Sequence, residues 1–252
     1  MNEIFESLDI KSNNIKKNII NSLESKKGPT DTSNWLTDKI LIGRMPNDCI
    51  ELKKIVKSGV TIFLSLREYE EAYPLCIDEF NEKDSKKYKK KEIFTRFNIP
   101  DFGTRDASLV KSLVDNIINY VNINNKKIMI HCLGGHGRTG MIVTPLIAVL
   151  FFLKEIENKK SKNYIDRDQK SEWTVLENKI DRVIESLFVK AQAYIMISLR
   201  LHRKSNRSEL KTVKQIRVPE THAQDEIVKE VIKIYINNYL KTGKLYYGLE
   251  TI

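Results

Sequence analysis

Hydrophobic and polar residues alternate along the middle of the chain in blocks typical of short strands and helices. Continuous apolar runs predict buried strands at 40–42, 60–66, 93–99 and 126–131. Apolar residues that recur every three or four positions predict helices at 49–57, 107–121, 140–156, 174–203 and 221–240. Buried strands that alternate with helices are typical of α/β proteins. We therefore predict an α/β fold with a central, mostly parallel sheet flanked by helices and a mainly helical C-terminal part.

The polar segments of the pattern suggest the domain boundaries. Residues 1–33 are rich in Asn, Lys and Ser, which indicates an N-terminal extension or linker. A single domain is then expected over residues 34–245. The stretch 157–172 is charged and hydrophilic, so we predict an insertion near 154–175. A second basic stretch, at 81–91, is predicted to be an exposed loop.

Composition limits the kind of partner and compartment. The net charge is +10, which favours an anionic partner such as a phosphorylated protein, or contact with an anionic lipid. Cys49, Cys76 and Cys132 are the three cysteines, and they lack paired spacing, so a reducing compartment is expected rather than disulfides or a zinc site. The N-terminus has no secretory pattern, and the apolar run 141–153 is shorter than a bilayer requires. We expect a cytoplasmic protein without a transmembrane segment.

One loop carries the clearest chemical signal. The segment IMIHCLGGHGRTG, at 128–140, contains four of the ten glycines in the chain. An apolar strand leads to His131 and Cys132, and an apolar helix follows Gly140. A glycine-rich turn before a helix presents backbone N–H groups and the positive end of the helix dipole, which together bind phosphate. The same field stabilises a thiolate, and Arg138 can reach back across the turn with two N–H groups.

This loop resembles the signature of the cysteine-dependent protein tyrosine and dual-specificity phosphatases, H-C-x-x-G-x-x-R-[ST]-G. The resemblance implies a fold of the dual-specificity type and a phosphomonoesterase that needs no metal or other cofactor. It makes Cys132 the nucleophile, which forms a phosphocysteine, and Thr139 the hydroxyl that hydrogen-bonds the thiolate. His131 would support the loop from behind or be an ordinary buried histidine, and these readings stay open. The implied phosphate cradle consists of Leu133, Gly134, Gly135, His136, Gly137 and Arg138.

The reaction also needs a carboxylic acid to protonate the leaving group. The segment NIPDFGTRD, at 98–106, lies between a predicted strand and a predicted helix and resembles the acid loop of the same family. The resemblance selects Asp101. Asp106 is the competitor, although it stands where a helix cap is expected. Farther along, Gln224 in ETHAQ resembles the glutamine that positions the hydrolytic water, or it is only a residue of a helix's first turn.

The sequence leaves more than one class of substrate open. A phosphorylated protein is expected, with phosphotyrosine preferred over phosphoserine and phosphothreonine. The alternatives are a phosphoinositide phosphatase and a catalytically dead phosphate-binding module. Nucleic acid is not expected as a substrate, because the RNA triphosphatases of this type usually carry Asn before the arginine, where this chain has Gly137. A regulatory disulfide from Cys49 or Cys76 to Cys132 is a further open alternative.

Overall fold

A mixed six-stranded sheet forms the centre of the computed structural model. The structure describes residues 23–68, 93–122, 126–161, 180–203 and 217–242. The strand order is β1-β2-β3-β6-β4-β5. The strands β3, β6, β4 and β5 are parallel, whereas β1 and β2 are antiparallel additions at one edge. The bounds are β1 Lys26–Lys27, β2 Ser33–Trp35, β3 Ile40–Arg44, β4 Val60–Ser65, β5 Ile93–Arg96 and β6 Lys127–Cys132.

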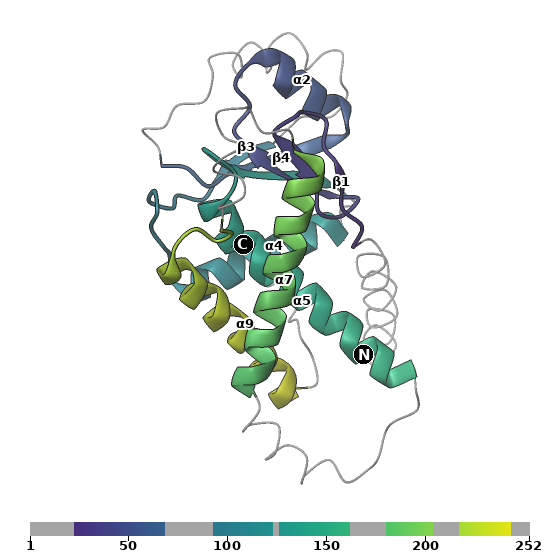
Figure 1. The fold of residues 1–252 in the computed structure, drawn as a ribbon, viewed down its shortest axis with the longest axis vertical. Helices are drawn as coiled ribbons and strands as arrows, with labels where there is room; N and C mark the ends of the chain where they lie inside the picture. Colours follow the sequence, from purple (N-terminus) through teal and green to yellow (C-terminus); the bar gives the residue numbers. More distant parts are fainter. Residues whose placement is uncertain (1–22, 69–92, 123–125, 162–179, 204–216, 243–252) are drawn as a thin grey trace, which may run out of the picture.

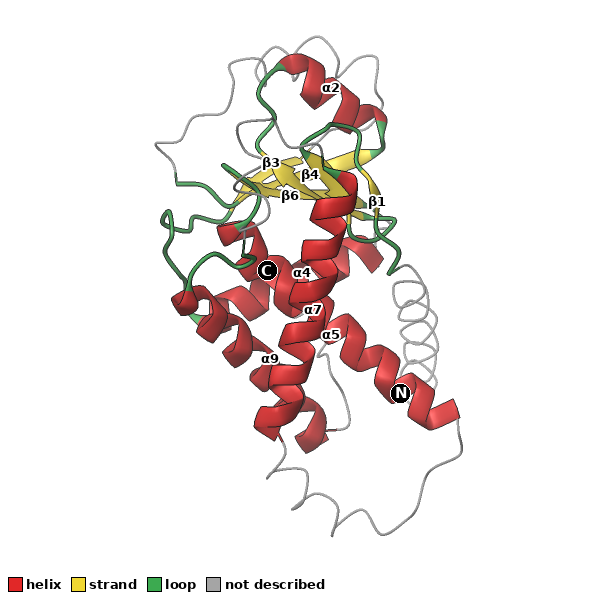
Figure 2. Cartoon of the chain, in the orientation of Figure 1, coloured by secondary structure: helices red, strands yellow, loops and turns green. Residues whose placement is uncertain are grey.

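Helices cover both faces of this sheet. The short helix α2 lies on one face, and four longer helices gather on the other (Figure 1; Figure 2). The bounds are α2 Cys49–Lys57, α4 Ala107–Asn122, α5 Gly137–Ser161, α7 Ile180–His202 and α9 His222–Thr242. The predicted fold class, a mostly parallel sheet flanked by helices with a helical C-terminal part, is confirmed.

The two faces of the sheet bury different side chains because residues alternate in direction along each strand. Leu41, Phe63 and Met129 point toward α2, with Trp35 beside them, in the smaller core. Residues one position away, such as Ile130, point toward the four-helix side and the larger core. β6 is buried on both faces, which explains its continuous apolar sequence.

The pairing of the strands brings their carboxyl ends to one edge of the sheet. Arg44 of β3 lies opposite Cys132 of β6, and Ser65 of β4 lies opposite His131. Ligands bind at the carboxyl ends of the strands in open α/β sheets. This edge therefore holds the candidate site, and α5 starts from it.

Two boundaries differ from the sequence prediction. β1 and Ser33 of β2 belong to the sheet, so the folded domain begins before residue 34. Their polar sequence hid them, because an edge strand needs no apolar run. Residues 154–161 continue α5 and are not part of a loop insertion. The rest of that predicted insertion, the basic stretch 81–91 and Cys76 lie outside the described residues.

α5 is the central helix of the fold. Its segment Gly137–Ile156 is long and apolar enough to cross a membrane by length and composition, which the sequence analysis did not expect. However, 67% of the most apolar window is buried inside the protein. The helix packs against α4, α7 and α9, as expected of a core helix in a folded domain.

Candidate active site

Cys132 is the last residue of β6, and the glycine-rich loop starts directly after it. The thiol is buried, and the backbone N–H of Gly135 donates a hydrogen bond to its Sγ at 3.1 Å. The loop is attached to the neighbouring strand, since the Met45 N–H donates to the carbonyl of Cys132 at 3.0 Å. The strand therefore fixes the sulfur at the start of a turn from which the Gly135 amide faces it.

Glycine is required at one position of this loop. Gly135 has a φ of +75°, and a Cβ there would lie 2.3 Å from the carbonyl oxygen of Gly43. Both the dihedral angle and the close approach of β3 exclude other residues. At Gly137 a Cβ would lie 2.2 Å from Oε2 of Glu220, so a larger residue there would displace the end of that side chain. The bare backbone thus lets the loop close tightly against its surroundings.

Arg138, in the first turn of α5, is paired with the predicted general acid. Its Nη2 lies 3.0 Å from Oδ1 of Asp101, and its Nη1 donates to the carbonyl of Ile99 at 3.4 Å. The Arg138 side chain is only 2% exposed, whereas that of Asp101 is 51% exposed. The structure therefore brings the predicted phosphate-binding guanidinium and the predicted acid together from segments 37 positions apart in the chain.

Asp101 lies in a tight turn. Gly103 donates its N–H to the carbonyl of Pro100 at 2.9 Å, and Phe102 at the third position has a φ of 55°. A bulky residue in this left-handed region is strained, and such residues cluster at functional sites. The competitor Asp106 directly precedes α4, and its carbonyl accepts the first helical hydrogen bond, from Val110. It therefore occupies the cap position, as predicted.

Gln224 ties the acid loop to the segment before α9. Its Oε1 accepts hydrogen bonds from the backbone N–H groups of Glu220 at 3.1 Å and Thr221 at 3.4 Å. Its Nε2 donates to the carbonyl of Gly103 at 3.0 Å. The side chain is fully buried. This geometry favours a positioning role over the water-binding role that the resemblance implied.

Glu220 is a site residue that the sequence analysis missed. Its carboxylate lies against Gly137, whose amide hydrogen-bonds to it. Burial and the nearby negative charge of Asp101 raise the pKa of Glu220, and Arg138 and the Gly137 amide oppose that shift. It stands in the same short segment as Gln224, but no spacing rule connects it to the cysteine loop.

Arg203, directly after α7, is the second missed residue. Its Nε donates to Oδ1 of Asn34 at 2.7 Å, and its Nη1 donates to the carbonyl of Gly135 at 3.4 Å. Burial lowers the pKa of Arg203 to about 9, and the charge of Cys132 acts in the opposite direction. The guanidinium thus stays charged at neutral pH and favours the thiolate from behind the loop. No local pattern marks such a residue.

The two histidines of the motif are neutral at neutral pH. Burial lowers the pKa of His131 to about 3, and the charges of Arg67 and Arg96 act in the same direction. Burial, together with the charge of Arg203, lowers the pKa of His136 to about 4. His131 is completely buried behind the loop, in agreement with both open readings of its role. His136 adds no positive charge to the cradle.

The remaining predicted residues line the loop in different ways. Leu133 is 52% exposed beside the nucleophile, and Gly134 is exposed as well. Thr139 is completely buried, and its Oγ has no hydrogen-bond partner among the described residues. The predicted hydrogen bond from Thr139 to the thiolate is therefore not formed in this structure.

The assembled groups match the needs of phosphoryl transfer to sulfur. They supply a buried nucleophile, backbone amides and a guanidinium for an anion, and a carboxyl group close to that guanidinium. Within the described part of the chain, no group of three or more His, Cys, Asp and Glu side chains could hold a metal ion.

Solved structures with a similar fold are phosphatases or phosphatase-like proteins. Tk-PTP in its active form is 19% identical, with 80% of this chain and 97% of that chain covered and a TM-score of 0.46. A human tyrosine phosphatase-like serine/threonine/tyrosine-interacting protein is 12% identical over 74% and 95%, with a TM-score of 0.43. Kinase-associated phosphatase is 15% identical over 81% and 88%, with a TM-score of 0.42.

The sequence itself matches a family model. No curated protein matches the chain. Residues 30–186 match the model described as PTP-SAK, Swiss Army Knife protein, DSP-PTPase phosphatase domain. That range includes β2 to β6, the acid loop and the cysteine loop, and it stops before Arg203, Glu220 and Gln224. The chain therefore belongs to the Swiss Army Knife family of dual-specificity-type phosphatase domains.

Proposed function

We propose that the protein hydrolyses phosphotyrosine, and more slowly phosphoserine and phosphothreonine, in protein substrates through a cysteinyl-phosphate intermediate. The observation that carries the proposal is the convergence of Cys132, Arg138 and Asp101. Cys132 receives an amide hydrogen bond, Arg138 is buried beside the loop, and Asp101 lies 3.0 Å from Arg138. A binding module without catalysis would need neither the thiolate nor the acid.

The first step transfers the phosphoryl group to sulfur. The thiolate of Cys132 attacks phosphorus, and the bond from phosphorus to the leaving oxygen breaks. Arg138 and the loop amides stabilise the charge on the other phosphoryl oxygens. Asp101 gives its proton to the leaving oxygen, which departs as an alcohol or phenol. In the second step water attacks phosphorus, phosphate leaves, and the electron pair of the P–S bond returns to sulfur.

Two exposed apolar side chains support a protein substrate with an aromatic leaving group. Phe102 is 64% exposed directly after Asp101, and Leu133 is 52% exposed directly after Cys132. Large apolar side chains left in water next to a polar site are suited to contact an aromatic ring. The neutral His136 supports the same preference over a polyanionic inositol headgroup.

The cellular compartment is part of the proposal. A catalytic thiolate requires a reducing environment. The two described cysteines, Cys49 and Cys132, are free thiols. We infer an intracellular, cytoplasmic location.

Steady-state hydrolysis tests this function. Purified protein would be assayed with p-nitrophenyl phosphate, matched phosphotyrosine, phosphoserine and phosphothreonine peptides, and inositol phospholipids in mixed micelles. We expect the highest kcat/KM with phosphotyrosine peptides and no activity in Cys132→Ser. A preference for the lipids would replace the protein substrate by a phosphoinositide. A wild type that binds vanadate but hydrolyses none of these compounds would be a phosphate-binding module.

A further inference from the structure

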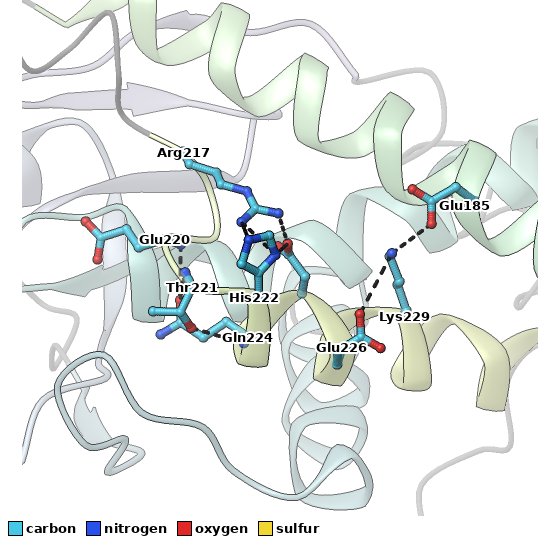
Figure 3. Close-up of polar contacts among 9 residues, drawn as sticks. Glu185, Arg217, Glu220, Thr221, His222, Gln224, Glu226 and Lys229 are labelled. Carbon is cyan, nitrogen blue, oxygen red and sulfur yellow. Dashed lines mark hydrogen bonds and ion pairs between the residues drawn. The ribbon is translucent and has the colours of Figure 1, made fainter.

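A second carboxyl group lies at the candidate phosphate cradle. Glu220 belongs to the segment between Arg217 and α9, and in Figure 3 its side chain points away from that helix. A Cβ placed on Gly137 would lie 2.2 Å from Oε2 of Glu220 and 3.0 Å from its Cδ. The carboxyl group therefore packs directly on the loop backbone.

The carboxylate of Glu220 uses a donor that belongs to the cradle. The amide of Gly137 hydrogen-bonds to Glu220, and it is one of the N–H groups at the start of α5 that would hold a phosphoryl oxygen. Asp101 pairs in the same way with Arg138 at 3.0 Å. Two carboxyl groups thus lie next to donors that a phosphate would use.

The backbone around Glu220 is held firmly in place. Its N–H donates to Oε1 of the buried Gln224 at 3.1 Å. A Cβ on Gly140 would lie 2.5 Å from Cγ1 of Val218 and 3.1 Å from Cα of Pro219, so the preceding residues pack on the first turn of α5. The segment that carries Glu220 is therefore held against the start of α5.

The two carboxyl groups have different surroundings. Asp101 lies with its Oδ1 3.0 Å from Nη2 of Arg138, and 51% of its side chain is exposed. Burial and the charge of Asp101 raise the pKa of Glu220, while Arg138 and the Gly137 amide act against that shift. These are the charged groups that influence Glu220 in the described residues. A raised pKa brings a carboxyl group closer to neutral pH, where a general base is most effective.

We propose that Glu220 is the general base of the second half-reaction, while Asp101 is the acid of the first. This inference rests on the proposed phosphatase function. Glu220 takes a proton from water as the water oxygen bonds to phosphorus. The P–S bond breaks, its electron pair returns to Cys132 as a thiolate, and inorganic phosphate leaves. Glu220 then releases this proton to solvent and Asp101 takes one up from solvent, which completes the cycle.

Glu220→Gln is the informative variant, because the glutamine keeps an oxygen that can accept from the Gly137 amide but cannot take a proton. The matched control is Glu226→Gln, which removes a carboxylate in α9, where Glu226 lies 3.9 Å from Nζ of Lys229 (Figure 3). Glu220→Ala removes the acceptor too. Thermal unfolding and vanadate affinity would show that each variant keeps a folded cradle.

Rapid-mixing kinetics with p-nitrophenyl phosphate separate the two half-reactions. We expect Glu220→Gln to release one equivalent of nitrophenolate at the wild-type rate and then turn over about 100-fold more slowly. The phosphocysteine should accumulate and be trapped by acid quench. The acidic limb of the kcat profile, which reports a base that must be ionised, should disappear. Glu220→Ala should behave in the same way, and Glu226→Gln should match the wild type.

Three results would overturn the inference. Wild-type kcat in Glu220→Gln, with loss only in Glu220→Ala, would mean that Glu220 only supports the loop through its hydrogen bond. A slowed first phase without accumulated phosphocysteine would assign Glu220 to the first step. Loss of vanadate binding in Glu220→Gln would make it part of the cradle. An inactive wild type is a different outcome, since it would refute the proposed function itself.

Discussion

Arg138 and Asp101 form an ion pair, with Nη2 of the arginine 3.0 Å from Oδ1 of the aspartate. Almost all of the Arg138 side chain is buried, and an unpaired guanidinium there would be costly. Asp101 therefore satisfies in the free protein the group that would hold phosphate in the complex. A bound phosphate dianion would compete with Asp101 for Arg138.

The first prediction concerns Asp101→Asn. Asparagine keeps the shape but cannot donate the proton to an alkoxide or phenoxide leaving group. We expect kcat for phenyl phosphate and phosphotyrosine peptides to fall by about 100-fold or more. p-Nitrophenyl phosphate, whose leaving group needs less assistance, should be affected less. Steady-state assays with both substrates measure the difference.

Asp106→Asn is the control for this change, because Asp106 lies at the start of α4 and Asn is an equally good helix cap. Its activity should equal that of the wild type. The assignment of the acid would be reversed if Asp106→Asn lost activity and Asp101→Asn kept it.

A second prediction follows from the three backbone partners of Gln224. Gln224→Ala would release Gly103 of the acid loop as well as Glu220 and Thr221. We expect a loss of about 1–3 kcal/mol in the free energy of unfolding and a drop in kcat that is larger for phenyl phosphate than for p-nitrophenyl phosphate. Urea unfolding and substrate comparison measure these effects. Unchanged kcat for both substrates and an unchanged free energy of unfolding would contradict the positioning role.

The cysteine loop and the acid loop could be predicted because each is a local pattern. The apolar strand before Cys132 and the apolar helix after Gly140 are confirmed as β6 and α5. Asp101 follows a strand and precedes a helix in the sequence, and the parallel sheet brings both loops to the same edge. Topology alone therefore explains why these residues meet.

The other parts of the site depend on long-range packing. Arg203 reaches Gly135 from 68 positions away, and Glu220 reaches Gly137 through a segment that follows α7. Neither residue belongs to a periodic pattern or a motif of fixed spacing. The strands β1 and β2 were missed for a related reason, since pairing at an edge requires backbone hydrogen bonds rather than an apolar sequence.

The third prediction concerns Arg203. Its charge favours the thiolate of Cys132, so Arg203→Met should slow alkylation of Cys132 by iodoacetamide at pH 6, where the thiolate fraction limits the rate. The expected reduction is roughly 3- to 10-fold, the size of an electrostatic effect of about 1 kcal/mol. Arg203→Lys keeps the charge and should preserve more of the rate. Equal rates in all three proteins would show that the guanidinium only holds Asn34 and Gly135 in place.

A fourth prediction addresses the exposed aromatic side chain in the acid loop. Phe102→Ala removes the aromatic ring. Alanine, like phenylalanine, is strained at a φ of 55°, so the cost of this backbone conformation stays the same. We expect KM for phosphotyrosine peptides to rise several-fold, while KM for small alkyl phosphates and the affinity for vanadate stay constant. Leu133→Ala should act in the same direction. An equal rise in KM for the peptides and for the small alkyl phosphates would argue against an aromatic contact.

The last prediction is the loss of stability in mild acid. The pKa of His131 is lowered to about 3 and that of His136 to about 4, whereas both would have ordinary values near 6.5 in the unfolded chain. Above pH 6.5 both histidines are neutral in the folded and in the unfolded protein. They therefore do not lower the free energy of unfolding there. As the pH falls below 6.5, the unfolded state binds protons that the folded state does not, so stability decreases until the folded pKa is reached.

Each histidine should remove roughly 1 kcal/mol per pH unit over that range, down to about pH 4 for His136 and about pH 3 for His131. Urea unfolding at pH 7, 6 and 5 measures the slope. His136→Asn, at the more accessible of the two positions, should reduce the slope by about half without moving the activity maximum. Glu220 acts in the opposite direction, because a raised folded pKa stabilises the protonated protein. Glu220→Gln should therefore make the acid-induced loss steeper, and a shallower loss would contradict the raised pKa of Glu220.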